Sequence, residues 1–282
     1  MDVNNNSDTI FVETLMIVIC NNSDIYDKII INYWFNIINY ISKNKLENKI
    51  KIYLVFGKGS NTQKFKDIKK NIFIASCEEN FKNILKKTVI SIRHFSKIYN
   101  YKYLIRSNIS SFWIIDNLLA LTNELPIKNV YVGPVTRKWG KRTWFFYISG
   151  CAIIMSKDVV QKIINTNVNK LNHDNADDIE IFRIVNTKLL AFPEYDYFSG
   201  KIIHKEKKIY FKKVSNKYSS IYLENMKILD YKLTIFNSIY EFTKLNNVFH
   251  IRIKSTIERE KDIQLFQYLS QKFFSNKNIK NN

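Results

Sequence analysis

The stretch Tyr103-Leu104-Ile105-Arg106-Ser107-Asn108-Ile109-Ser110-Ser111-Phe112 contains the most informative change of character in the chain. It begins as an apolar strand, continues into a polar turn and is followed by a helix-like run from Ile114 to Leu121. In α/β proteins, a strand end that carries polar side chains faces a ligand crevice. We therefore expect a binding site here, with Arg106 either contacting a phosphate or pairing with a structural acid.

Strands and helices alternate around this stretch. Short apolar runs predict strands at 15–20, 50–56, 72–75 and 103–105, and helical spacing predicts helices at 25–42 and 83–99. The second half predicts strands at 129–133 and 249–253, and helices at 156–164, 177–188 and 258–274. This alternation is typical of an α/β fold with a doubly wound, mainly parallel sheet flanked by helices. We expect one domain over residues 1–282, with a core at about 11–200 and a less regular α+β extension at 201–282.

The chain is strongly basic. It has 44 Lys and Arg residues against 25 Asp and Glu, a formal net charge of +19. Such a charge favours anionic partners: nucleic acid, an anionic membrane surface or a phosphorylated small substrate. The basic residues are spread along the chain, however, whereas a nucleic-acid tail forms a denser block. A solvated lysine surface is therefore the simpler interpretation, and we do not expect nucleic acid as a partner.

The cysteines and the hydropathy of the chain indicate where in the cell the protein is found. Cys20, Cys77 and Cys151 lie far apart without metal-binding spacing, which indicates reduced thiols. No apolar stretch reaches the length of a membrane span, and the first residues lack the order of a signal peptide. We expect a soluble, cytoplasmic protein without a membrane span.

The late strand Phe249-His250-Ile251-Arg252-Ile253-Lys254 combines apolar and basic residues. The period of two in a strand puts His250, Arg252 and Lys254 on one face. Three such side chains in a row could hold a diphosphate. An exposed strand face in a lysine-rich protein explains the pattern equally well.

Two further segments carry candidate site residues. Asp174, Asp177 and Asp178 could share a helix face, where clustered carboxylates raise one another's pKa as a general base requires. Local sequence instead favours an acidic cap at a helix N-terminus.

At Ser149-Gly150, a small residue allows the backbone to approach a ligand closely. Trp144 precedes it and offers an aromatic face for a sugar, although such residues are more often part of a core.

Four segments, in order, carry a resemblance to a known family. Residues 79–88 read Glu-Asn-Phe-Lys-Asn-Ile-Leu-Lys-Lys-Thr, and the stretch 104–112 follows. Residues 146–160 contain Ser149-Gly150 and Ser156-Lys157-Asp158, and Asp177-Asp178-Ile179 ends the series. This set resembles the fringe and β-1,3-galactosyltransferase family, and is most similar to the glycosyltransferase-like proteins of large DNA viruses.

The resemblance implies a GT-A-like fold and an inverting transfer of a sugar from a UDP-sugar to a hydroxyl of a glycan or glycoprotein acceptor. It places Asp178 as the general base, with Asp177 supporting it or contacting the acceptor. Ser149, Gly150 and Trp144 would then lie near the sugar, and the likeness to viral proteins extends the expected location to a host cytoplasm or a virion. His250 corresponds to a late histidine that helps the family to bind metal or phosphate.

The chain departs from this family at its acidic metal-binding triplet, where Asn108-Ile109-Ser110 stands. Mg²⁺ and Mn²⁺ prefer carboxylate and water oxygens, so Asn108 and Ser110 would bind either ion weakly. Any remaining metal ligands would be Ser110 and His250. The expected donor site therefore comprises Arg106, Asn108, Ser110, His250, Arg252 and Lys254, with the need for Mn²⁺ or Mg²⁺ left open.

Three functions stay open on sequence alone. The first is an active glycosyltransferase with altered metal use and Asp178 as base. The second is a degenerate transferase that binds a nucleotide-sugar or glycan without turnover, which the missing acids favour. The third is a basic nucleic-acid-associated protein, which only the net charge supports.

Overall fold

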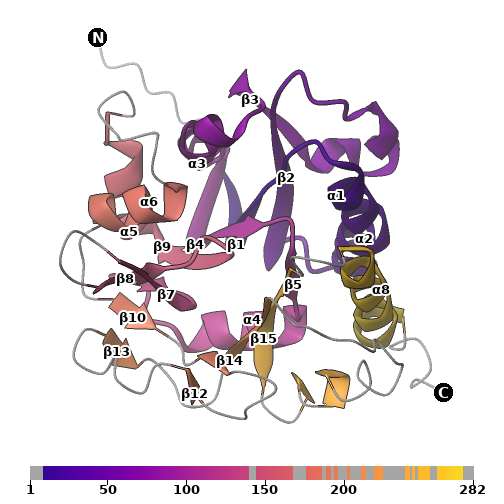
Figure 1. Cartoon of the computed structure of the whole chain (residues 1–282). Coiled ribbons are helices and arrows are strands. Elements are labelled where there is room, and N and C mark those ends of the chain that lie inside the picture. The colour runs from indigo at the N-terminus through magenta and orange to yellow at the C-terminus, as the bar shows by residue number, and fades with distance from the viewer. Residues whose placement is uncertain are drawn as a thin grey trace.

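The computed structural model in Figure 1 describes four long ranges of the chain and several short ones. The long ranges are 9–139, 144–167, 176–185 and 259–275. The short ones are 189–191, 194–195, 202–203, 211–213, 219–224, 239–241, 243–244 and 247–254. No helix within these ranges has the length and apolar character needed to cross a bilayer.

A six-stranded sheet forms the centre of the molecule, in the order β3-β2-β1-β4-β9-β6. Its strands are β1 (Ile10–Ile19), β2 (Ile50–Lys58), β3 (Ile72–Glu78), β4 (Tyr99–Asn108), β6 (Tyr131–Val132) and β9 (Ala152–Ser156). The pairs β3-β2, β2-β1 and β1-β4 are parallel, whereas β9 pairs antiparallel with β4 and β6. The mainly parallel α/β sheet predicted from sequence is confirmed.

Helices cover both faces of this sheet (Figure 1). On β1, Met16 and Val18 belong to one apolar cluster and Leu15 and Ile17 to the other, as the period of two requires. The first cluster includes side chains of α1 (Asp24–Ile29), η1 (Ile30–Trp34), α2 (Phe35–Lys43), α4 (Ile115–Glu124) and α8 (Arg259–Ser270). The second includes side chains of α3 (Ile84–Ile98), α5 (Lys157–Ile164) and α6 (Asp177–Val185). Burial on both faces explains the continuous apolar runs of these strands.

A second sheet of five strands lies beside the first, in the order β12-β11-β14-β15-β5. Its strands are β5 (Ser111–Trp113), β11 (Glu194–Tyr195), β12 (Ile202–Ile203), β14 (Ser219–Glu224) and β15 (Val248–Lys254). The remaining elements are η2 (Gln63–Asn71), η3 (Phe81–Asn83), β7 (Val135–Trp139), β8 (Trp144–Ile148), β10 (Leu189–Ala191), β13 (Phe211–Lys213) and η6 (Gln271–Ser275).

The turn Asn108-Ile109-Ser110 joins the two sheets. It leaves β4 in the first sheet and enters β5 in the second. β15 pairs antiparallel with β5, with Arg252 opposite Ser111, and the Ile253 amide donates to the Ser110 carbonyl at 3.1 Å. The late basic strand therefore lies beside the polar turn, although 140 residues separate Ser110 from His250.

Candidate functional site

A cavity of about 470 Å³ opens where the first sheet changes strand order. The chain builds β1, β2 and β3 outward in one direction and then places β4 on the other side of β1. Ile19 at the end of β1 pairs with Asn108 at the end of β4, and both line the cavity. Ligands of open α/β sheets bind in this crevice, outside the carboxyl ends of the strands.

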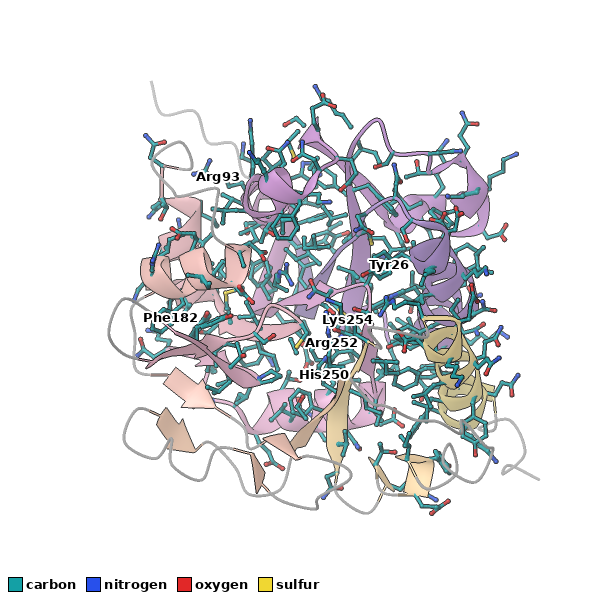
Figure 2. All side chains as sticks on the ribbon, in the orientation of Figure 1. Tyr26, Arg93, Phe182, His250, Arg252 and Lys254 are labelled. Carbon is teal, nitrogen blue, oxygen red and sulfur yellow. The ribbon has the colours of Figure 1, made fainter. Side chains whose placement is uncertain are left out.

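Four residues of the predicted donor site line this cavity: Asn108, Ser110, Arg252 and Lys254. The other lining residues are Ile19, Cys20, Asn21, Asn22, Tyr26, Glu79, Asn80, Phe81, Ile84 and Ile109. Figure 2 shows His250, Arg252 and Lys254 in a row along β15. Arg252 is only 7% exposed and Lys254 is exposed, so β15 brings one buried and one accessible cation to the same cavity.

His250 occupies a different environment from the other two residues of this row. It is fully buried and does not line the cavity. Its Nδ1 lies 2.7 Å from Ser220 Oγ on β14, and its ring centroid lies 4.9 Å from that of Trp113. Burial and then the Arg252 charge hold the pKa of His250 well below its usual range. The idea that this strand face is simply exposed is wrong for His250 and Arg252, which are 0% and 7% exposed.

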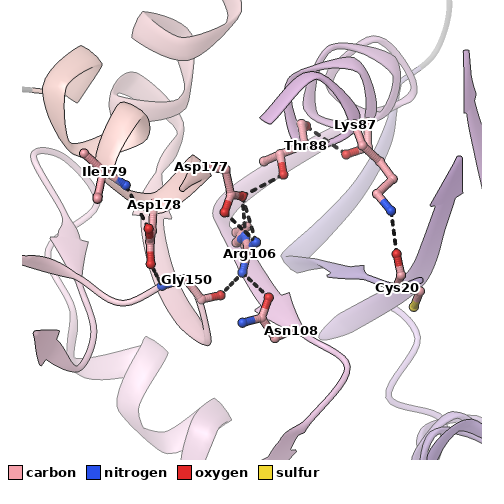
Figure 3. A network of polar contacts seen from close by, with 10 residues as sticks. Cys20, Lys87, Thr88, Arg106, Asn108, Gly150, Asp177, Asp178 and Ile179 are labelled. Atoms are coloured by element: carbon pink, nitrogen blue, oxygen red, sulfur yellow. Dashed lines mark hydrogen bonds and ion pairs between the residues drawn. The ribbon is translucent and has the colours of Figure 1, made fainter. Parts of the chain in front are cut away.

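Arg106 makes a buried ion pair with Asp177 at the start of α6 (Figure 3). Its Nε and Nη2 each donate to a carboxylate oxygen of Asp177 at 2.9 Å. Its Nη1 donates to Asn108 Oδ1 and to the Gly150 carbonyl. Thr88 Oγ1 also donates to Asp177, at 2.9 Å. Of the two roles considered for Arg106, this geometry fits pairing with a structural acid, and Arg106 does not line the cavity.

Asp178 follows Asp177 in the first turn of α6 and has no ion pair in the described part of the chain. Its oxygens accept from the Gly150 amide at 2.8 Å and from the Ile179 amide at 2.9 Å. Burial raises the pKa of Asp178 and the Asp177 carboxylate raises it further, while the Gly150 amide, Arg106 and the Ile179 amide oppose the rise. Asp178 does not line the cavity. It is connected to Asn108 through Gly150 and Arg106. Asp174 lies outside the described residues.

Gly150 is needed for the close approach of Arg106. A Cβ atom at this position would lie 2.7 Å from Arg106 Nη1 and 3.3 Å from the Cβ of Asp178. The small residue predicted to admit a ligand therefore admits a protein side chain. Ser149 is half-buried beside it, and its amide donates to the Pro134 carbonyl at 2.8 Å. Of Trp144, the structure describes the backbone in β8 and not the side chain.

Glu79, which lines the cavity, belongs to a buried ion pair that the sequence did not reveal. Lys87 is 1% exposed and donates to Glu79 Oε1 at 2.6 Å and to the Cys20 carbonyl at 2.5 Å. Glu79 Oε2 accepts from the Gly57 amide and from Ser60 Oγ. The pair ties together the carboxyl ends of β1, β2 and β3. Glu79 and Lys87 are eight positions apart, so no helical spacing predicts their contact.

The cavity does not fit a divalent cation. Arg106 can only donate, so Asn108 turns Oδ1 toward it and keeps its NH₂ group for other partners. Glu79 is the only carboxylate among the lining residues that the structure describes, and both of its oxygens are engaged. Ser110 lines the cavity and His250 does not. No group of three His, Cys, Asp or Glu side chains suited to a metal occurs in the described ranges.

No protein-family model matches the sequence, and no curated protein matches it. Among solved structures, the chain is similar to one described as "Crystal Structure of A197 from STIV", with 12% sequence identity and a TM-score of 0.34. The match covers 64% of this chain and 82% of that chain. At this identity and TM-score the likeness supports no conclusion about function. Any functional proposal therefore rests on the geometry of the site.

Proposed function

We propose that the chain is a GT-A-like glycosyltransferase that binds a nucleotide-sugar, a UDP-sugar in the first instance, in the cavity between β1 and β4. The observation that carries this proposal is the composition of the cavity. It lies at the topological switch point and presents Arg252 and Lys254 next to the neutral donors of Asn108 and Ser110. Such a combination of cations and hydrogen-bond donors suits a diphosphate.

The reaction is an inverting transfer to a hydroxyl of a glycan or glycoprotein acceptor. Asp178 takes the proton of the acceptor hydroxyl as its oxygen forms a bond to C1 of the sugar. The bond from C1 to the diphosphate oxygen breaks, and its electron pair leaves with the nucleoside diphosphate. The raised pKa of Asp178 supports this assignment, because a base whose pKa lies closer to neutrality accepts a proton more readily than an ordinary carboxylate.

The two adjacent acids take different roles in this proposal. Asp177 is committed to Arg106 and Thr88, so it supports the site and does not act as the base. Arg106 links Asp177 to Asn108 and Gly150, which connects the proposed base to the proposed donor site. Pairs of carboxylates in contrasting environments commonly divide their roles in this way.

The test combines donor turnover with binding. UDP-, GDP- and dTDP-sugars are incubated with the wild-type chain and with Asp178→Asn, and released nucleotide and bound donor are both measured. We expect turnover of a donor by the wild type and a loss of about 100-fold or more in Asp178→Asn, the upper part of the usual range for a general base. Donor binding should stay within about twofold, because Asp178 lies outside the cavity lining.

A second candidate is a nucleotide-sugar-binding module without turnover. Both oxygens of Asp178 accept backbone amides, which favours a structural carboxylate. Binding of a donor with equal, negligible turnover in the wild type and Asp178→Asn would establish this second function and reject the first. Binding of none of the donors would reject both.

A further inference from the structure

The diphosphate that leaves in the proposed reaction gains negative charge as the bond to the sugar breaks, and this charge must be stabilised. Transferases that use an acidic triplet stabilise it with a divalent cation. Here the corresponding turn offers the opposite chemistry. Asn108 Oδ1 accepts a hydrogen bond from Arg106, so the side-chain NH₂ group of Asn108 is available to donate to a ligand. Ser110 is buried and lines the cavity with a hydroxyl that can also donate.

The charges around the cavity point the same way. Glu79 is neutralised by Lys87 at 2.6 Å, within a buried pair. Among the described lining residues, Arg252 and Lys254 are the two cations, and the only carboxylate, Glu79, is already paired. Their positions two apart on β15 aim both side chains from one face of the strand. A divalent cation would be repelled by this arrangement, whereas a diphosphate is attracted by it.

From this geometry we infer that Arg252 and Lys254, helped by the donors of Asn108 and Ser110, take the place of a divalent cation, so that the chain binds and releases its nucleoside diphosphate without metal. This inference rests on the proposed function. Both cations keep their protons throughout, and the electron pair of the broken bond stays on the diphosphate oxygen. The His250 imidazole, behind Arg252 in the same row, takes no part in contacting the ligand.

The experiment is a calorimetric titration of the full chain with UDP, once in EDTA and once with Mn²⁺. We expect dissociation constants that agree within about twofold, and an affinity that falls steeply with salt because the contacts are between charges. Binding that needs Mn²⁺, with an affinity at least about tenfold weaker in EDTA, would overturn the inference and leave the proposed function standing. No binding under either condition would overturn both.

Variants identify the cations. Lys254→Ala should weaken UDP binding in EDTA by about tenfold, as expected for the loss of one charged contact to a phosphate. Lys254 is exposed, so this variant should fold. Arg252→Lys keeps the charge and removes the planar fork, and should weaken binding less than Arg252→Ala. Lys66→Ala, an exposed lysine outside the cavity, is the matched control and should bind as the wild type does. Equal affinities of Lys254→Ala and Lys66→Ala would contradict the assignment.

A gain-of-metal variant gives an independent readout. Ser110→Asp places a carboxylate in the cavity lining beside the proposed diphosphate. We expect UDP binding in EDTA to fall, and Mn²⁺ to restore part of it, because the new oxygen ligand can hold the ion between two anions. Circular dichroism checks that the variant is folded, since Ser110 is buried. A folded Ser110→Asp chain that binds UDP as the wild type does in EDTA would contradict the placement of the diphosphate.

Discussion

Asp177 and Asp178 are neighbours in the chain and have very different surroundings. Asp177 is 5% exposed and receives three hydrogen bonds from Arg106 and Thr88. Asp178 is half-buried and receives only backbone amides. Sequence alone left a helix cap and a catalytic base as alternatives for both. The difference between them arises from Arg106, which lies 71 positions away and whose contact no local pattern reveals.

The pH dependence of transfer should report on Asp178. Its pKa is raised above the ordinary value of 3.8, so the reactive ionised form is lost at a higher pH than for an exposed carboxyl. We expect kcat/KM to fall with decreasing pH along a limb of slope one. The midpoint of this limb should lie above the ordinary carboxyl pKa of about 4. A profile that stays flat down to that pH would contradict the role of Asp178.

The stability of Asp178→Asn provides the matching control. Because the folded pKa is raised, the favourable contribution of this group is present when it is protonated and is lost as pH rises through its folded pKa. At neutral pH the amide removes the buried charge but leaves one of the two backbone amides without an acceptor, so we expect the melting temperatures of Asp178→Asn and the wild type to be close. A marked decrease in the melting temperature of this variant would mean that its lost activity reflects unfolding.

Gly150→Ala tests the close packing of Arg106. The new Cβ would lie 2.7 Å from Nη1, inside van der Waals contact, and Arg106 is held by Asp177 so that it cannot move freely. We expect a loss of about 1–3 kcal/mol in the free energy of unfolding, the usual range for overpacking. Ser149→Ala, at the half-buried neighbour, should cost less than about 1 kcal/mol. Urea denaturation measures both, and equal costs would contradict the argument.

At the scale of elements, the Arg106–Asp177 pair joins β4 to α6. Both side chains are almost fully buried, at 2% and 6% exposure. Removing one partner leaves the other charge buried without compensation. We expect Arg106→Met to cost roughly 3–5 kcal/mol. The double variant Arg106→Met/Asp177→Leu should cost clearly less than the sum of its single variants, as a double-mutant cycle by urea denaturation would show. Additive costs would mean that the two charges do not interact.

β15 provides a second prediction at this scale, because it holds a buried histidine. The pKa of His250 is lowered in the folded state, so its contribution to stability is present above the unfolded pKa of about 6.5 and is lost as pH falls below it. The stability of the wild type should fall below that pH by up to about 1.4 kcal/mol per unit from this group. In His250→Asn the fall should be shallower, and parallel curves for the two chains would contradict the assignment.

The elements show how far sequence reasoning reaches here. Apolar runs and helical spacing predict β1 to β4 and α3 to α6 because their burial is periodic along the chain. The period of two in β15 places Arg252 and Lys254 on the cavity side correctly. The burial of His250 is missed because the side chains that contact it, Ser220 and Trp113, are distant in sequence. The antiparallel pairing of β9 with β4 is missed because pairing direction also depends on distant segments.

At the scale of the whole molecule, the C-terminal part completes the core of the N-terminal part. Tyr33 of η1 stacks on Phe112 of β5 with ring centroids 4.5 Å apart and packs against Phe266 of α8 at 5.2 Å. Phe249, Ile251 and Ile253 of β15 are buried in the same cluster. The candidate site likewise needs both parts, because β15 provides its cations and β4 its donors.

This shared core predicts a single cooperative unfolding transition. The two sheets cannot separate without exposing the aromatic cluster to water, which is unfavourable in proportion to the apolar area uncovered. We expect urea curves from far-ultraviolet circular dichroism and from tryptophan fluorescence to coincide. An early, separate fluorescence transition would show that the packing of β15 against Trp113 is lost before the rest of the fold, and would contradict the single transition.

The most direct test of the account is a crystal structure of the full chain with UDP, grown without divalent cations. The account predicts the diphosphate between Arg252 and Lys254, within hydrogen-bond distance of the Asn108 NH₂ group. Its terminal phosphate, which carries the sugar in a UDP-sugar, should lie toward Gly150 and Asp178. A nucleotide bound away from the end of β4, or one held through a metal ion with Arg252 and Lys254 turned aside, would contradict it.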